Sequence, residues 1–292
     1  MSTNKVSENP ESRFSTALVS AAGLPGVRID REAYLRSALT RHCSEEQIRR
    51  AIEETPAAAG IPLGVLDKAA NDSINYESAK VSTLSAAAGI PGLIFLPATV
   101  SADLAQYFGH MLRIAQKLAY LYSWPDLFSG DSDEIDDATR GILTLFFGVM
   151  FGTQSANSAV GKVAGMMSEQ VAKKLPQKAL TQGVIYPVVK KVAKYLGVEM
   201  TKKTFANSVS KAIPLVGAVV SGGLTLATYR PMAKRLKKHL ADLELTKPAD
   251  QAVDADVVDV EVVEVHEPSA ADRTERHDAD DTAVAPENPR AS

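Results

Sequence analysis

Five polar residues at steps of three and four lie on one predicted helix and have side chains suited to chemistry. This polar stripe consists of Asp103, Gln106, His110, Arg113 and Lys117. At 100° per residue, all five fall within roughly 80° of the helix circumference. If the polar stripe lines a cleft, Asp103 or His110 is suited to act as a general base and Arg113 to hold an anion. The pattern then predicts a small-molecule-binding protein or a hydrolase.

A structural role for the polar stripe is the alternative. Buried charges are normally paired or hydrogen-bonded, and groups on neighbouring helices can satisfy Asp103, Arg113 and Lys117. The sequence contains no nucleophile motif, phosphate-binding loop or dinucleotide fingerprint. We therefore assign no catalytic residue and no cofactor, and the pattern favours a non-enzymatic protein while leaving an enzyme open.

Capping residues and apolar spacing place the helices that must position the polar stripe. Asp30 is suited to cap one short helix, and Ser44 with Gln47 forms a capping box at the start of the next. Apolar residues at three- and four-residue steps predict a long helix over about 63–88 and the stripe helix over 101–122. The predicted fold class is all-α, a multi-helix bundle whose apolar helices are broken by Gly and Pro.

Charge is distributed unevenly along the 292 residues. Residues 249–292 hold 13 acidic and three basic side chains, a net charge of −10, whereas residues 162–239 hold 15 basic and two acidic ones, a net charge of +13. A segment rich in Ala, Asp and Pro cannot bury enough apolar surface to fold alone. We expect a disordered N-terminus at 1–16, an N-terminal helical segment at 17–80, a helical core at 81–246 and a disordered acidic tail at 247–292.

The basic half contains two predicted amphipathic helices whose apolar faces are bordered by cations, one with an apolar face from Val184 to Leu196 and a last helix from Pro231 to Leu243. The candidate surface cations are Lys190, Lys191, Lys194, Arg230, Lys234, Arg235, Lys237 and Lys238. Long cationic side chains beside an apolar stripe suit an anionic membrane surface, where each adds roughly 1 kcal/mol of attraction. Solvated faces of ordinary core helices are the alternative. Aromatic residues are not interleaved with the lysines, so a stacking surface for nucleic acid is missing.

Three uncharged stretches approach the length of a membrane span, namely 81–102, 141–161 and 212–229. Prolines interrupt the first and third, and the second contains Gln154 and Asn157. These features favour buried helices of a soluble bundle, with insertion of 212–229 left open. The five histidines lack partners at metal-ligand spacing, so we expect no metal site. The lone Cys43 and an N-terminus without a secretory pattern indicate a reducing cytoplasm.

Two blocks of the chain resemble the bacterial EcsC family. The first combines Ala87-Ala88-Gly89-Ile90-Pro91-Gly92 and Leu96-Pro97-Ala98 with the run from Leu112 to Tyr122; the second runs from Lys211 to Gly223 and is followed by Tyr229-Arg230. The resemblance implies an all-helical bacterial domain without an established activity. Together with the charge pattern, it leads us to expect a non-enzymatic protein that docks on the cytoplasmic membrane face, or on a membrane protein complex, through its basic C-terminal half. The oligomeric state stays open.

Overall fold

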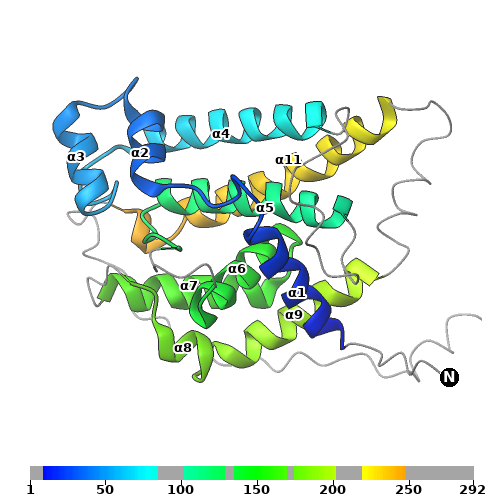
Figure 1. Cartoon of the computed structure of the whole chain (residues 1–292). Helices are drawn as coiled ribbons and strands as arrows, with labels where there is room; N and C mark the ends of the chain where they lie inside the picture. Colours follow the sequence, from blue (N-terminus) through cyan, green and yellow to red (C-terminus); the bar gives the residue numbers. More distant parts are fainter. Residues whose placement is uncertain (1–8, 85–101, 129–134, 170–173, 202–218, 248–292) are drawn as a thin grey trace, which may run out of the picture. The chain divides into compact units, whose positions relative to one another are not determined.

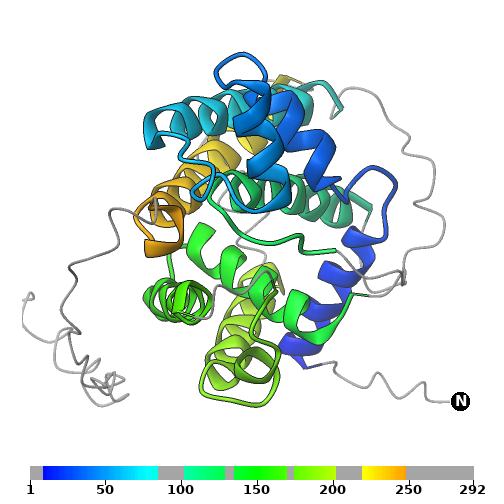
Figure 2. The ribbon, with the colours of Figure 1, turned by 90° about the vertical axis from the view of Figure 1, so that its left-hand side faces the viewer.

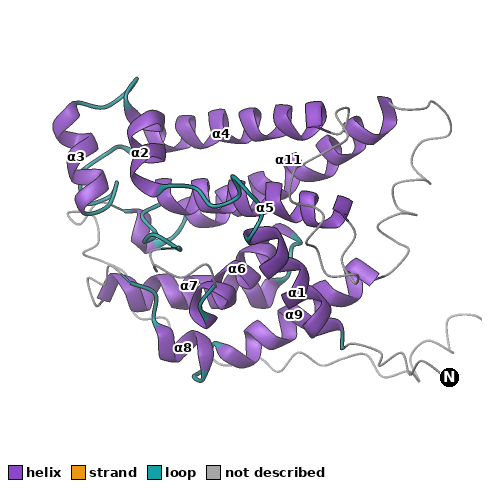
Figure 3. Cartoon of the chain, viewed as in Figure 1, coloured by secondary structure: helices purple, strands orange, loops and turns teal. Residues whose placement is uncertain are grey.

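Helices account for the regular structure of this chain in the computed structural model, which describes residues 9–84, 102–128, 135–169, 174–201 and 219–247. Within these ranges no strand occurs (Figure 3). The elements in chain order are α1 (Pro10–Ala22), α2 (Arg31–Leu39), α3 (Glu45–Glu53), α4 (Leu63–Leu84), α5 (Ala102–Leu121), α6 (Asp137–Met150), α7 (Gln154–Glu169), α8 (Gln177–Thr181), α9 (Tyr186–Thr201), α11 (Val219–Ala241) and the 3-10 turn η2 (Glu244–Thr246). The predicted all-α class is confirmed.

Helix α5, which carries the polar stripe, lies among five other helices. It packs against α1, α2, α4, α6 and α11, and α4 and α11 also pack against each other (Figures 1 and 2). From Met111 to Leu121 every α5 side chain except Arg113 is buried. The stripe is therefore on a core helix, where a charged side chain must find a partner from another element.

Helix α6 is the second central element and contacts α7, α8, α9 and α11. All residues from Gly141 to Met150 are buried. At Gly148 a Cβ atom would lie only 2.6 Å from the Ala156 Cβ and 2.7 Å from a methyl group of Val192, so the glycine lets α7 and α9 approach closely. Aromatic contacts link the two central helices: the ring centroids of Phe108 and Phe147 are 5.1 Å apart.

The expected disordered N-terminus at 1–16 is wrong for residues 10–16, which belong to α1; residues 1–8 lie outside the described part. Asn9 accepts a hydrogen bond from the Glu11 N–H, and Pro10 occupies the first turn, where its missing N–H costs nothing. Phe14, Ala17 and Leu18 are buried, and α1 packs against α5 and α9. The burial of these side chains against other helices thus stabilises α1, which its polar sequence does not predict.

The expected boundary between 80 and 81 is also wrong, because α4 runs through it from Leu63 to Leu84. The described helices belong to one compact unit within residues 1–253. The last helix was expected to begin at Pro231, yet α11 begins at Val219 and contains Pro231 in its interior. Residues 248–292, which cover nearly all of the predicted acidic tail, lie outside the described residues.

The uncharged stretch 141–161 is not one long span. It forms most of α6 and the first half of α7, joined by a turn at Phe151–Thr153 in which Gly152 has φ +83°. Of the stretch 81–102, residues 85–101 lie outside the described residues; of the stretch 212–229, residues 219–229 form the first half of α11 and residues 212–218 lie outside the described part. Among the helices that are described, none combines the length and apolarity that a bilayer crossing requires.

Candidate functional site

Two members of the polar stripe, Arg113 and Lys117, bind a carboxylate from a neighbouring helix. Arg113 donates from Nε and Nη2 to the two Glu77 oxygens of α4, each at 3.0 Å, and Lys117 Nζ donates to Glu77 Oε1 at 2.5 Å. The fork of the guanidinium matches the carboxylate, which makes a bidentate pair. These three residues, called the buried triad below, fasten α4 to α5.

Glu77 has no solvent-exposed side-chain surface, whereas the side chains of Arg113 and Lys117 are 19% and 9% exposed. Burial by itself would raise the pKa of the Glu77 carboxyl, but the hydrogen bonds from Arg113 and Lys117 outweigh it and lower the pKa. Glu77 is therefore ionised, and the buried triad holds two positive charges and one negative charge. One positive charge is left over in a largely desolvated place.

A cleft with a volume of about 770 Å³ opens beside the buried triad, lined by residues of α2, α4, α5 and the segment before α2. Lys117 lies at this cleft with its ammonium nitrogen 5.5 Å from the ring centre of Tyr34 and 5.1 Å from that of Tyr76. Both distances are within the range of cation–π attraction. The Tyr34 hydroxyl is hydrogen-bonded to the Ser73 hydroxyl at 2.7 Å. We call this space the tyrosine cleft.

Of the remaining members of the polar stripe, Gln106 and His110 make no hydrogen bond or ion pair to the buried triad within the described residues. His110 is 8% exposed, and its Nδ1 has no hydrogen-bond partner among the described residues. Its backbone carbonyl accepts a hydrogen bond from the Tyr229 hydroxyl at 3.2 Å. Burial lowers the pKa of His110. Gln106 is partly buried, and the Asp103 side chain lies outside the described residues. Neither Gln106 nor His110 lines the tyrosine cleft.

Gln116, which the polar stripe did not include, connects α5 to the segment before α2. Its fully buried side chain accepts a hydrogen bond from the Ile29 N–H at 2.8 Å and donates to the Val27 and Leu112 carbonyls at 2.9 Å. It thereby fixes one wall of the tyrosine cleft, to which Ile29 contributes. The sequence contained one signal for this role: Gln116 is an amide on an otherwise apolar face of the predicted helix.

The predicted surface cations of α9 are exposed. Lys190, Lys191 and Lys194 form no ion pair within the described residues, although the Lys190 ammonium lies 5.8 Å from the ring centre of Tyr186. Large apolar side chains are exposed beside them: Val184 is 73% exposed, Tyr186 40% and Tyr195 41%. We call this surface, from Val184 to Tyr195, the lysine face of α9.

The predicted cations of α11 divide into two groups. Arg230 donates to Asn75 Oδ1 at 2.5 Å, Arg235 donates to the Met150 carbonyl, and Lys237 pairs with Asp67 at 3.3 Å. These three tie α11 to α4 and α6. Lys234 and Lys238 are exposed and form neither an ion pair nor a side-chain hydrogen bond in the described part of the chain, whereas Arg230 and Arg235, also exposed, are held by neutral acceptors.

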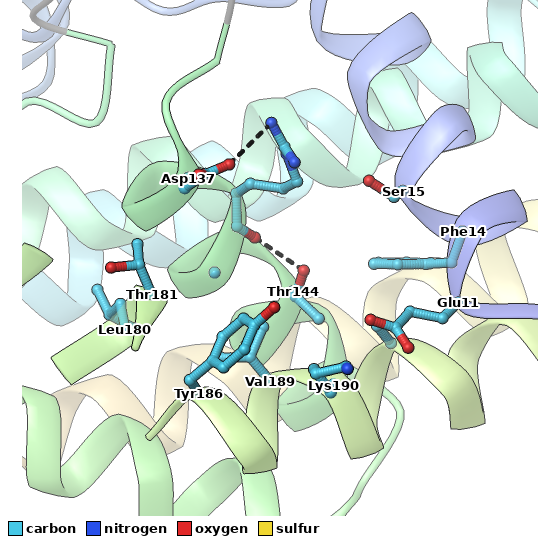
Figure 4. A pocket seen from close by; sticks show the side chains of 13 residues that line it. Glu11, Phe14, Ser15, Asp137, Thr144, Leu180, Thr181, Tyr186, Val189 and Lys190 are labelled. Carbon is cyan, nitrogen blue, oxygen red and sulfur yellow. Dashed lines mark hydrogen bonds and ion pairs between the residues drawn. The ribbon is translucent and has the colours of Figure 1, made fainter. Parts of the chain in front are cut away.

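A smaller cavity of about 160 Å³ lies between α1, α6, α8 and α9 and borders the lysine face (Figure 4). Figure 4 shows Thr144, Tyr186 and Lys190 around it, with Glu11 and Ser15 of α1 on the other side. Its charged groups are largely balanced, because Glu11 and Asp137 accompany Arg140 and Lys190, and Arg140 pairs with Asp137 at 3.2 Å. The cavity therefore offers no excess charge to a ligand.

In comparisons with known proteins, no family model, no curated protein and no solved structure matches this chain. The resemblance to the EcsC family stays a prediction. Within the described residues, no cluster of three or more His, Cys, Asp or Glu side chains is arranged to hold a metal ion.

Proposed function

We propose that the protein docks peripherally on an anionic membrane surface through the lysine face of α9. The observation that carries this proposal is the combination of three exposed lysines with exposed Tyr186 and Tyr195 on one helix. Lysine heads attract anionic lipid headgroups, while tyrosine rings settle at the boundary between headgroups and acyl chains.

The spacing of these residues places them on one outward side. Tyr186, Lys190 and Lys194 follow each other at four-residue steps, and Lys191 and Tyr195 form a second, adjacent row. The opposite side of α9 carries the buried Val189, Val192 and Leu196, which pack towards α1 and α6. Residues 170–198 contain no Asp or Glu, so no neighbouring carboxylate in this segment repels an anionic surface.

The eight cations predicted from sequence do not contribute equally to this proposal. Arg230, Arg235 and Lys237 are engaged within the fold, so their charges are less available to lipid than those of α9. The proposal therefore narrows the docking surface from the whole basic half to the lysine face. In line with the EcsC resemblance, we place this surface at the inner face of a bacterial cell membrane.

Vesicle flotation tests this proposal. Replacing Lys190, Lys191 and Lys194 by Gln removes three attractions of roughly 1 kcal/mol each, which lowers the partition coefficient on phosphatidylglycerol-containing vesicles about 100-fold. Wild-type binding should also fall between about 0.05 M and about 0.5 M salt, because the Debye length shrinks. Vesicles of phosphatidylcholine alone should bind little.

The matched control removes the same charge elsewhere: Lys68, Lys234 and Lys238, all exposed, are replaced by Gln. This control should keep most of the wild-type affinity. Equal losses in the two triple variants would show that net charge, rather than the lysine face, governs binding. Absence of salt-sensitive binding by the wild type would overturn the proposal altogether.

A further inference from the structure

We propose that the tyrosine cleft binds a small organic monocarboxylate, with Lys117 holding the carboxylate and Tyr76 stacking on the planar or apolar part of the ligand. The proposal is independent of membrane docking, since α9 does not line the tyrosine cleft. It rests on three observations: an unbalanced buried charge, aromatic walls and a cleft of suitable size.

The unbalanced positive charge indicates that the ligand is an anion. Glu77 neutralises one of the two cations of the buried triad. Arg113 donates hydrogen bonds from Nε and Nη2 to Glu77 and from Nη1 to the Gly26 carbonyl. Lys117 has a single hydrogen-bond acceptor, Glu77 Oε1, for its three N–H groups within the described residues. A buried cation with donors to spare is stabilised by an anion that reaches it.

The charge around Lys117 also limits how negative the ligand is. Two further cations, Arg28 and Arg41, and two carboxylates, Asp30 and Asp72, line the same cleft, so the net charge of the cleft together with the buried triad stays at +1. A monocarboxylate matches this net charge, whereas a dianion such as hydrogen phosphate would leave an uncompensated negative charge near Glu77, Asp30 and Asp72. A carboxylate also leaves the bidentate pair of Arg113 and Glu77 unchanged.

The walls of the tyrosine cleft indicate a planar or apolar body for the ligand. Tyr76 is 54% exposed, so part of its ring stays open to a ligand beside the Lys80 and Lys117 ammonium groups, which lie 4.8 Å and 5.1 Å from the ring centre. Ala33, Ala38 and Ile29 contribute apolar surface. The volume of about 770 Å³ falls within the range of small-molecule pockets. The Tyr34 and Ser73 hydroxyls hydrogen-bond to each other, so one of them keeps a proton to donate to a ligand oxygen.

The test adds benzoate, neutral benzamide or inorganic phosphate to the full-length protein. Binding is measured by ligand-observed NMR and by the chemical shifts of ring-labelled tyrosines in the protein. Benzoate should bind with a Kd in the millimolar range and shift the Tyr76 ring signals. Benzamide should bind about 10-fold more weakly because it lacks the charge, and phosphate should not shift these signals.

Lys117→Met should lower benzoate affinity at least about 10-fold, and the variant should still fold because Arg113 continues to neutralise Glu77. Tyr76→Ala, which alters a largely exposed side chain, should lower the affinity without removing the preference for benzoate over benzamide. The matched control Lys68→Met removes an exposed lysine of α4 that does not line the cleft and should bind as the wild type does. Equal binding of benzoate and benzamide, unchanged affinity in Lys117→Met, or no benzoate binding at all would each overturn the inference.

Discussion

Replacing Glu77 by Gln should destabilise the fold by about 3–5 kcal/mol, the cost of leaving a buried ion pair without one partner. Glu77 is completely buried and receives three charge-assisted hydrogen bonds, each worth about 1.5–3 kcal/mol. Glutamine keeps one carbonyl acceptor, so part of this interaction survives. The larger loss comes from Arg113 and Lys117, which remain mostly desolvated without a counter-charge.

Two further variants separate the effect of the unpaired charge on stability from the effect of lost packing. Lys117→Met removes the excess cation and keeps the bidentate pair, so we expect it to cost less than Glu77→Gln. Replacing all three residues of the buried triad by apolar ones (Glu77→Leu, Arg113→Met, Lys117→Met) should recover most of the stability, because no unpaired charge is left inside. Gly26, whose carbonyl loses the Arg113 donor, is exposed, so water can replace that hydrogen bond.

Urea unfolding followed by circular dichroism measures these free energies. For a domain with a total stability of about 5–15 kcal/mol, the loss in Glu77→Gln is large enough to shift the midpoint clearly. Glu46→Gln is the matched control, since Glu46 pairs with Arg49 in an exposed, solvent-screened place. If Glu77→Gln cost no more than Glu46→Gln, the buried triad would not be holding α4 to α5. A triple apolar variant as unstable as Glu77→Gln would refute the charge argument.

Two further predictions concern packing and pH. Gly148→Ala should lower the free energy of unfolding by about 1–3 kcal/mol, because the added methyl group meets Ala156 and Val192. Gly165→Ala in α7 is the control: open space surrounds this position, so the change should be neutral or stabilising by about 0.5–1 kcal/mol. Equal urea midpoints of the two variants would contradict this prediction. Burial lowers the pKa of His110 below its ordinary value of 6.5, so its stability contribution is complete above pH 6.5 and is lost as the pH falls and the unfolded chain takes up the proton. His110→Gln should therefore reduce the stability loss between pH 7 and pH 5 without abolishing it, since burial lowers the pKa of His239 too; an unchanged pH profile would refute this. Glu77 does not interfere in this range, because its lowered pKa confines its effect to pH values below 4.5.

Local signals allowed several elements to be predicted from sequence. Asp30 caps α2 by accepting the Ala33 N–H, and Ser44 with Gln47 forms both halves of the capping box of α3. These contacts join residues three apart in the chain, so a sequence pattern contains both partners. α1 was missed in its first turns because the burial of Phe14 depends on α5 and α9, which are distant in sequence. The last helix was predicted from Pro231 on, whereas α11 begins at Val219 and contains this proline in its interior.

The candidate site shows the same division between local and tertiary information. Periodicity brought Arg113 and Lys117 to one side of α5, but it did not identify Glu77 as their partner 36 and 40 residues earlier. A signal was nevertheless present. Leu66, Ala70 and Ile74 define the buried side of α4, and Glu77 follows Ile74 by three residues on that same side. A carboxylate at an apolar position requires a cationic partner from another helix, which the polar stripe offered.

The same reasoning explains why net charge alone overstates a docking surface. Lysines and arginines on a helix become structural when a packed neighbour offers a carboxylate, an amide or a free carbonyl, as Asp67, Asn75 and Met150 do for α11. The cations of α9 are exposed and form no ion pair within the described residues, and the exposed rings of Tyr186 and Tyr195 belong to the same helix. Three lysines provide roughly 3 kcal/mol of attraction to an anionic membrane, which is enough for reversible binding and too little for permanent anchoring. Docking through the lysine face is therefore expected to respond to lipid composition and salt, and to strengthen only when a second contact is made at the same time.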